Sequence, residues 1–151
     1  IGEGNEKKAV DYAHRFMVLV PILGILIGGL VIGFRNPILS LFKLSPDCHN
    51  TAMLLLLIYG IEVGLRNIPY ISVVGIFRAG GDTKTGMLYD APILYGFALP
   101  LTAVCGLVLK LDFVLVYIIM LLSEDVIKNI LCIRRVISKK WIMPVEGLGV
   151  R

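Results

Sequence analysis

Long apolar runs separated by short polar segments make up most of this chain. Two runs carry no charged residue, Phe16 to Gly33 and Ala91 to Leu109, and each is close to the ~20 residues that a helix needs to cross a bilayer. Residues 51–77 and 113–133 form two further long runs, which contain charged residues. The pattern predicts an all-α integral membrane bundle. Its four transmembrane helices are expected at about 14–34, 51–78, 86–109 and 113–135.

The composition places the chain among membrane proteins. Hydrophobic residues make up 57% of its 151 residues and the mean hydropathy is +0.85, whereas soluble domains contain roughly 45–50% apolar residues. The net charge of +4 does not indicate a nucleic-acid partner, because Lys and Arg lie at the ends of the predicted spans. Membrane lipid is the expected partner. Cys48, Cys105 and Cys132 lack the spacing of a metal or disulfide site, so no metal and no other cofactor is expected.

The basic residues predict how the chain crosses the membrane. The side that holds the start of the chain collects Lys7, Lys8, Arg15, Arg78, Lys84, Arg134, Arg135, Lys139 and Lys140. The other side collects Arg35, Lys43 and Lys110. Because cytoplasmic loops carry the excess of Lys and Arg, both ends are expected in the cytoplasm, in a multi-pass protein of the cell membrane. The chain opens with Ile1 and shows no signal peptide, so we expect a fragment of a longer protein.

The segment FRAGGDTKTG, residues 77–86, is the most polar stretch between two apolar runs. A phosphate-binding P-loop requires Gly-Lys-Ser/Thr, whereas Lys84 follows Thr83 here. A catalytic turn requires a nucleophile beside a base, and neither His14 nor His49 lies near this segment in the sequence. The segment therefore does not indicate an enzyme.

The same segment is typical of a tight cytoplasmic hairpin between two helices. Gly80 is expected to end the first helix in the left-handed conformation, and Gly81 allows the chain to reverse. Asp82 or the residue after it can cap the next helix. Arg78 is expected at the level of the lipid headgroups, on the positive side of the membrane.

Several motifs resemble the C-terminal part of MATE (multidrug and toxic-compound extrusion) transporters. The first is the helix that ends in RAGGDTK, followed by a helix with Asp90 and a later Pro-Leu. A Lys-Leu turn, a span with adjacent acids and a lysine, and the closing RxxSKKWI come next. The opening IGEGNEKKA resembles the loop after the eighth span of that family. The resemblance covers nearly the whole chain.

This resemblance implies spans nine to twelve of a twelve-span transporter with two six-helix lobes. Such proteins export organic cations or amphipathic drugs and metabolites, and sodium or protons act as the coupling ion. The N-terminal lobe of the same polypeptide would then be the partner of this chain, and the fragment alone would be inactive. Two alternatives remain: a lipid-linked oligosaccharide flippase of the same superfamily, which should have a more basic cavity, and a non-transporting membrane scaffold protein.

Charged residues within the second predicted span are candidates for coupling. Glu62 and Arg66 are spaced for an i,i+4 ion pair that faces the bundle interior, where it either orients the helix or takes part in ion passage. Asn67 and Pro69 follow. Pro69 leaves a backbone carbonyl without its helical hydrogen bond, so the helix could bend at this point or the carbonyl could line a cavity. Tyr59 could line a drug cavity or pack between helices. By the resemblance, some sodium-coupled members have an acid near the position of Asn67, so its absence here leaves that cation site in doubt.

The last two predicted spans contain further candidates. Asp90 lies about one turn into its span, either as a coupling acid or as an interfacial acid near Lys84. Glu124 and Lys128 share a helix face, while Asp125 points ~100° away from Glu124 and requires another partner or a proton. Alternatively, this part of the helix emerges among the headgroups. The candidates for cation or proton coupling are Glu62, Asp90, Glu124 and Asp125.

Small and aromatic residues predict how the helices pack. Gly24, Gly28 and Gly29 offer a face of the small-xxx-small kind, along which a second helix can approach closely. Trp141 follows the last predicted span and is expected to anchor the chain at the membrane interface.

Overall fold

The computed structural model describes residues 5–143, which form helices and no strand. The predicted all-α fold is confirmed for this part of the chain. Among these residues, a π-helical segment (labelled η) continues α3, a second joins α4 to α5, and a third continues α5. The elements are α1 (Glu6–Gly33), α2 (Arg35–Ser40), α3 (Pro46–Tyr70) with η1 (Ile71–Phe77), α4 (Thr83–Ile93), η2 (Leu94–Ala98), α5 (Leu99–Ala103), η3 (Val104–Val108) and α6 (Phe113–Ile137).

Within residues 5–143, three helices are long and apolar enough to cross a membrane. They are Glu6–Gly33 with 28 residues, Pro46–Phe77 with 32 and Thr83–Val108 with 26. Helix α6 has 25 residues, which is also sufficient length for a crossing. Charged residues lie in the middle of α6, so the fourth span remains a prediction from the sequence.

Polar side chains cap the starts of three helices. The side chain of Asn5 accepts a hydrogen bond from the backbone N–H of Lys8 at 3.1 Å, as its position predicted. Ser45 caps α3 at 3.5 Å, and Asp112 caps α6 at 3.0 Å. Helices α1 and α3 therefore begin before the apolar runs from which the spans were predicted.

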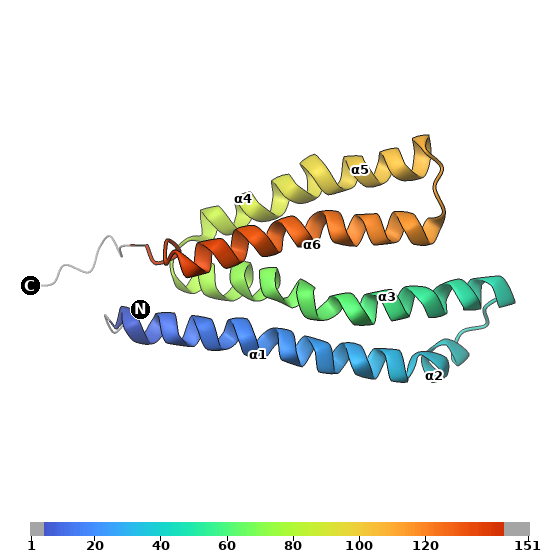
Figure 1. Cartoon of the computed structure of the whole chain (residues 1–151), viewed down its shortest axis with the longest axis horizontal. Coiled ribbons are helices and arrows are strands. Elements are labelled where there is room, and N and C mark those ends of the chain that lie inside the picture. The colour runs from blue at the N-terminus through green and yellow to red at the C-terminus, as the bar shows by residue number, and fades with distance from the viewer. Residues whose placement is uncertain (1–4, 144–151) are drawn as a thin grey trace, which may run out of the picture.

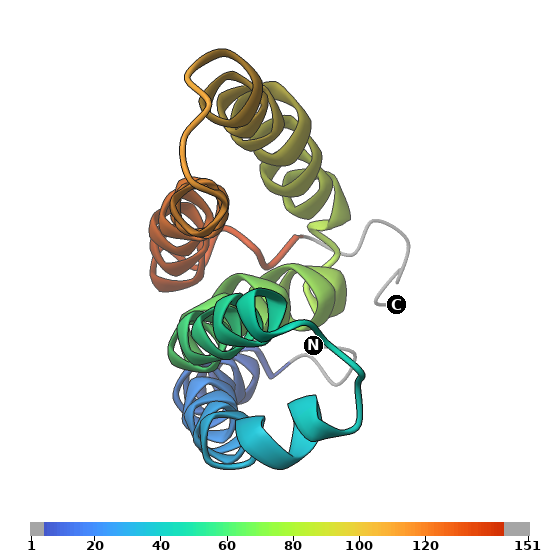
Figure 2. The same cartoon turned by 90° about the vertical axis from the view of Figure 1, so that its right-hand side faces the viewer.

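The long helices run alternately up and down. In Figures 1 and 2, α1 and the α4–α5 segment lie on opposite sides, with α3 and α6 between them. The start of α1, the α3–α4 loop and the end of α6 lie at one end of the bundle, and α2 lies at the other (Figure 1). The basic segments 7–15, 78–84 and 134–140 thus share one end.

Glycines allow α1 and α3 to pack closely. Gly24 and Gly28 of α1 are buried against Gly60 and Gly64 of α3, and a Cβ atom added at Gly28 would collide with the carbonyl oxygen of Gly60. The predicted packing face is confirmed at Gly24 and Gly28. It is wrong at Gly29, which is exposed and has open space around its Cα, because it lies on the outer side of α1.

A proline precedes each π-helical turn. Pro69 comes before η1, Pro92 before η2 and Pro100 before η3. Proline has no backbone N–H and its ring crowds the carbonyl one turn earlier, so the regular hydrogen-bond ladder cannot continue through it. A shift to the wider π-helical pattern keeps the backbone groups paired. The helices therefore continue through these prolines with local irregularity.

The α3–α4 hairpin forms with a different division of roles from the one predicted. Gly81, and not Gly80, has the positive φ of +82° that glycine tolerates best. Gly80 is required for space, because its Cα lies against Trp141. Trp141 is only 2% exposed, so the predicted interfacial anchor is instead part of the core. The backbone N–H of Met143 donates to the carbonyl oxygen of Gly80 at 2.8 Å, which ties the end of the described chain to the hairpin.

Asp82 precedes α4, but its side chain makes no capping hydrogen bond. Its carboxylate is fully buried and accepts from Arg135 of α6, with Oδ2 at 2.9 Å from Nε and 2.7 Å from a terminal guanidinium nitrogen. The prediction that Asp82 caps α4 is therefore wrong. Its side chain is bound by Arg135 of α6, a residue that comes 53 positions later in the chain. Arg78 is exposed, as a headgroup contact requires.

Candidate functional site

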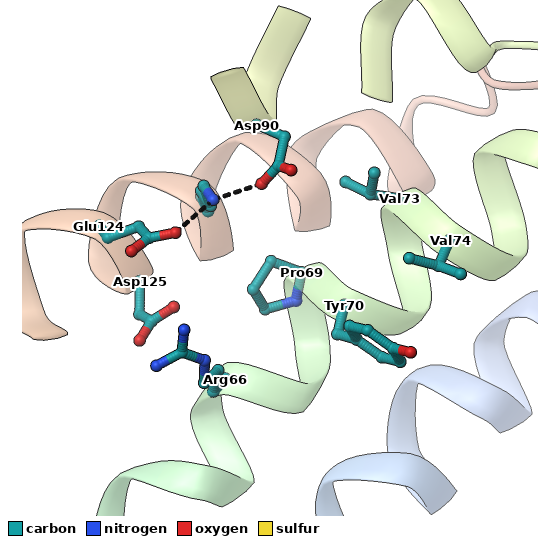
Figure 3. Close-up of a pocket in the computed structure, with 9 residues that line it drawn as sticks. Arg66, Pro69, Tyr70, Val73, Val74, Asp90, Glu124 and Asp125 are labelled. Atoms are coloured by element: carbon teal, nitrogen blue, oxygen red, sulfur yellow. Dashed lines mark hydrogen bonds and ion pairs between the residues drawn. The ribbon is translucent and has the colours of Figure 1, made fainter. Parts of the chain in front are cut away.

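A cavity of about 200 Å³ lies between α3 with η1, α4 and α6. Figure 3 shows its walls, with charged side chains on one side and Pro69 and Tyr70 on the other. Nine residues line the cavity: Arg66, Pro69, Tyr70, Val73, Val74, Asp90, Glu124, Asp125 and Lys128. Five of them are charged, although every element that contributes to the cavity is predominantly apolar.

Lys128 joins two acids from two helices. Its ammonium group lies 2.5 Å from Oε1 of Glu124 and also forms an ion pair with Oδ1 of Asp90 (Figure 3). The Lys128 side chain is 7% exposed, whereas the Asp90 side chain is 58% exposed. An ammonium group loses its hydration when it is buried, so it requires such partners. The predicted Glu124–Lys128 pair is confirmed, and Asp90 is paired with Lys128 in place of the expected proximity to Lys84.

Glu62 and Asp125 form the second group of charged residues. Glu62 is 7% exposed and Asp125 is 5% exposed. Both carboxylate oxygens of Glu62 and Oδ2 of Asp125 are buried without a hydrogen-bond donor. The two side chains lie near each other between α3 and α6. Two ionised carboxylates have no proton to share, so a hydrogen bond between them requires that one carries a proton.

The predicted Glu62–Arg66 ion pair is wrong. Within residues 5–143, neither residue takes part in an ion pair. The Arg66 side chain extends into the cavity toward Asp125 (Figure 3), while Glu62, one turn earlier, is buried in the packed part of α3. Helical spacing allows such a pair, but Arg66 turns into the cavity whereas Glu62 is not among the residues that line it.

The position of Asp125 and Lys128 follows from the pattern of α6. The buried residues of this helix recur at intervals of three or four: Leu121, Asp125, Lys128, Cys132 and Val136. This spacing describes one face of a helix. Asp125 and Lys128 therefore occupy core positions of the bundle, and the depth of this part of α6 in the membrane stays a prediction.

Not every candidate from the second predicted span lies at the cavity. Pro69 is buried and lines it. Asn67 does not line it, because its amide group lies against Gly24 of α1. Tyr59 is 37% exposed and also lies outside the lining residues. Asn67 and Tyr59 therefore lie outside this cavity, and their roles as hinge or cavity residues stay predictions.

The sequence reasoning missed the apolar wall of the cavity, formed by Val73 and Val74. The only sequence signal for them was their position in the turn after Pro69, where the structure forms a π-helical segment. It also missed the Asp90–Lys128 pair, whose members are 38 residues apart. No group of three or more His, Cys, Asp or Glu residues within 5–143 is arranged to hold a metal ion.

Long apolar helices around a charged cavity define a multi-pass membrane protein. The family model described as MatE matches residues 1–104, more than half of the chain. The chain therefore belongs to the MatE family of transporters, as its motifs indicated. The match includes Glu62, Asp90 and the α3–α4 hairpin, and it ends before α6. Comparison with curated proteins and with solved structures gave no match.

Proposed function

We propose that this chain forms part of a cation-coupled multidrug antiporter that exports organic cations or amphipathic drugs across the cell membrane. The observation that carries the proposal is the pair of buried carboxyl groups of Glu62 and Asp125, whose buried oxygens lack a donor and of which Asp125 lines the charged cavity. Charged groups inside a membrane are costly, and they mark ion and proton pathways. In the arrangement implied by the resemblance, the other lobe completes the transporter, and this chain alone does not transport.

The charge of the cavity favours drug export over the flippase alternative. Asp90, Glu124 and Asp125 line the cavity with Arg66 and Lys128, so acids outnumber bases. A cavity for lipid-linked oligosaccharides, whose diphosphate is anionic, should be basic. The buried carboxyl pair also favours a transporter over a scaffold, because a scaffold does not require ionisable groups between its helices.

Export from energised membrane vesicles tests the proposal. The chain is assembled in its full-length transporter, and export of a fluorescent organic cation is followed. Glu62→Gln and Asp125→Asn are each expected to lower the export rate by roughly tenfold, equivalent to about 1.4 kcal/mol. The reason is that neither amide can take up and release a proton.

Asp112→Asn is the matched control. Asp112 is an exposed acid that caps α6, and asparagine caps a helix equally well. This variant should export at the unchanged rate. Full export by both Glu62→Gln and Asp125→Asn, at equal amounts of protein, would remove the carboxyl pair from the coupling pathway.

A further inference from the structure

We propose that Lys128 acts as a built-in cation that excludes sodium from the acidic cluster, so that the Glu62–Asp125 pair exchanges protons. This inference deepens the proposed function and rests on it, because it names the coupling ion. It identifies Lys128 as a positioning residue that determines ion specificity.

The first step concerns the oxygen atoms that a sodium ion would need. Hard cations are bound by several oxygen ligands, chiefly carboxylates and carbonyls. Asp90 and Glu124 are the two acids that line the cavity beside Asp125. The ammonium group of Lys128 already contacts an oxygen of each of them. A sodium ion between these acids would have to displace a buried positive charge that is covalently attached to α6.

The second step concerns the acids that remain. Glu62 and Asp125 are the unpartnered pair, more than nine-tenths buried. The groups near Glu62 are Arg66 on α3, and Glu124, Asp125 and Tyr117 on α6; Tyr59 on α3 lies near Tyr117. Arg66 points toward Asp125 but is not within ion-pair distance of either acid (Figure 3).

A proton satisfies this pair with fewer ligands than a metal ion needs. The hydroxyl group of one protonated carboxyl donates to the carboxylate of the other, which gives both buried groups a partner. Without that proton, two like charges would lie buried close together with no hydrogen-bond donor between them. The pair therefore has a place for one shared proton. Nothing is oxidised or reduced, and only the O–H bond forms or breaks.

A carbodiimide assay tests the inference without requiring transport. Dicyclohexylcarbodiimide reacts with protonated carboxyl groups in apolar surroundings, and mass spectrometry locates the product. The purified chain is labelled in liposomes over a pH series, in sodium chloride or in choline chloride at equal ionic strength. We expect labelling of Glu62 or Asp125 that falls as the pH rises and is the same in both salts.

Variants of Lys128 provide the decisive comparison. In Lys128→Gln the amide still donates hydrogen bonds but the charge is gone, so sodium should now slow the labelling. Lys128→Arg retains the charge and should restore labelling that is independent of sodium. A merely structural role for Lys128 would not give this dependence on sodium. Glu62→Gln with Asp125→Asn is the blank, in which labelling at this site is lost.

The outcomes separate the two proposals. Sodium protection of the unaltered chain would overturn the inference, and this arm decides the matter even if Lys128→Gln does not fold. A folded Lys128→Gln that remains indifferent to sodium would overturn the role of Lys128. If labelling behaves as expected and the assembled transporter fails to export organic cations, the proposed function alone is wrong.

Discussion

At the scale of single residues, the α3–α4 hairpin depends on a carboxylate that water does not reach. Asp82 is fully buried, and its one ionic partner in residues 5–143 is Arg135, whose side chain is 19% exposed. Arg135 also donates to Oγ1 of Thr85 at 3.3 Å. One guanidinium group thus connects the end of α6 to the hairpin and to the first turn of α4.

Replacing Arg135 with Leu should destabilise the protein by about 3–5 kcal/mol, because removal of one partner leaves a buried charge without compensation. Thermal unfolding in detergent, followed by circular dichroism, measures the change. The neighbouring Arg134→Leu is the control, since Arg134 is exposed and forms none of the ion pairs of residues 5–143. Equal melting temperatures for the two variants would contradict this role of Arg135.

Local contacts could be predicted from the sequence, and distant ones could not. The Glu124–Lys128 pair and the Asn5 cap follow from spacing within one helix. The Asp82–Arg135 pair joins residues far apart in the chain, and it depends on how α6 packs against the hairpin. Spacing also failed for Glu62 and Arg66, because a shared helix face permits contact but does not require it.

At the scale of elements, the contact between α1 and α3 depends on the close approach of their two backbones at glycine residues. In lipid, close van der Waals packing has a large share in helix association, since lipid chains are as apolar as the helices. The closest approach is at Gly28 and Gly60. The periodicity of apolar residues does not reveal this glycine contact between α1 and α3, but the four-residue spacing of Gly24 and Gly28 did indicate it.

Gly28→Leu should separate α1 from α3 and destabilise the protein by about 1–3 kcal/mol or more, as overpacking does. The added side chain would meet the backbone of Gly60, which cannot move aside as a flexible side chain can. Thermal unfolding in detergent provides the measurement. Gly29→Leu adds the same side chain one position later, where no atom lies within 4 Å, and should leave stability nearly unchanged. Comparable losses of thermal stability in both variants would contradict the close glycine contact between α1 and α3.

At the scale of the whole molecule, charge and apolarity are divided between inner and outer helices. Helices α3 and α6 lie between the others (Figure 2) and contribute Glu62, Arg66, Asp125 and Lys128. Helix α1 and the α4–α5 segment lie outside, and many of their large apolar side chains are exposed. The all-α fold could be inferred from the sequence, and three of the four predicted spans correspond to helices that are long and apolar enough to cross a membrane. Which helices would be neighbours could not be inferred, because that depends on contacts between distant segments.

If all four predicted spans cross the membrane, the alternating helices place the α2 end of the bundle on one side of the membrane and the α3–α4 hairpin on the other. Lys43 follows α2 and Cys48 lies in the first turn of α3, whereas Lys84 lies in the first turn of α4, beside the hairpin; all three are exposed. Figure 1 shows α2 and the hairpin at opposite ends of the bundle. In whole cells, a membrane-impermeant maleimide should label Cys48 in the unaltered chain, because that end is predicted to face outward. In a Cys48→Ser background, it should label Lys43→Cys at once and Lys84→Cys only after permeabilisation. Cys105 and Cys132 are buried and should stay unlabelled, so they need no replacement. Labelling of Lys84→Cys in intact cells would place the hairpin outside and reverse the orientation inferred from the basic residues.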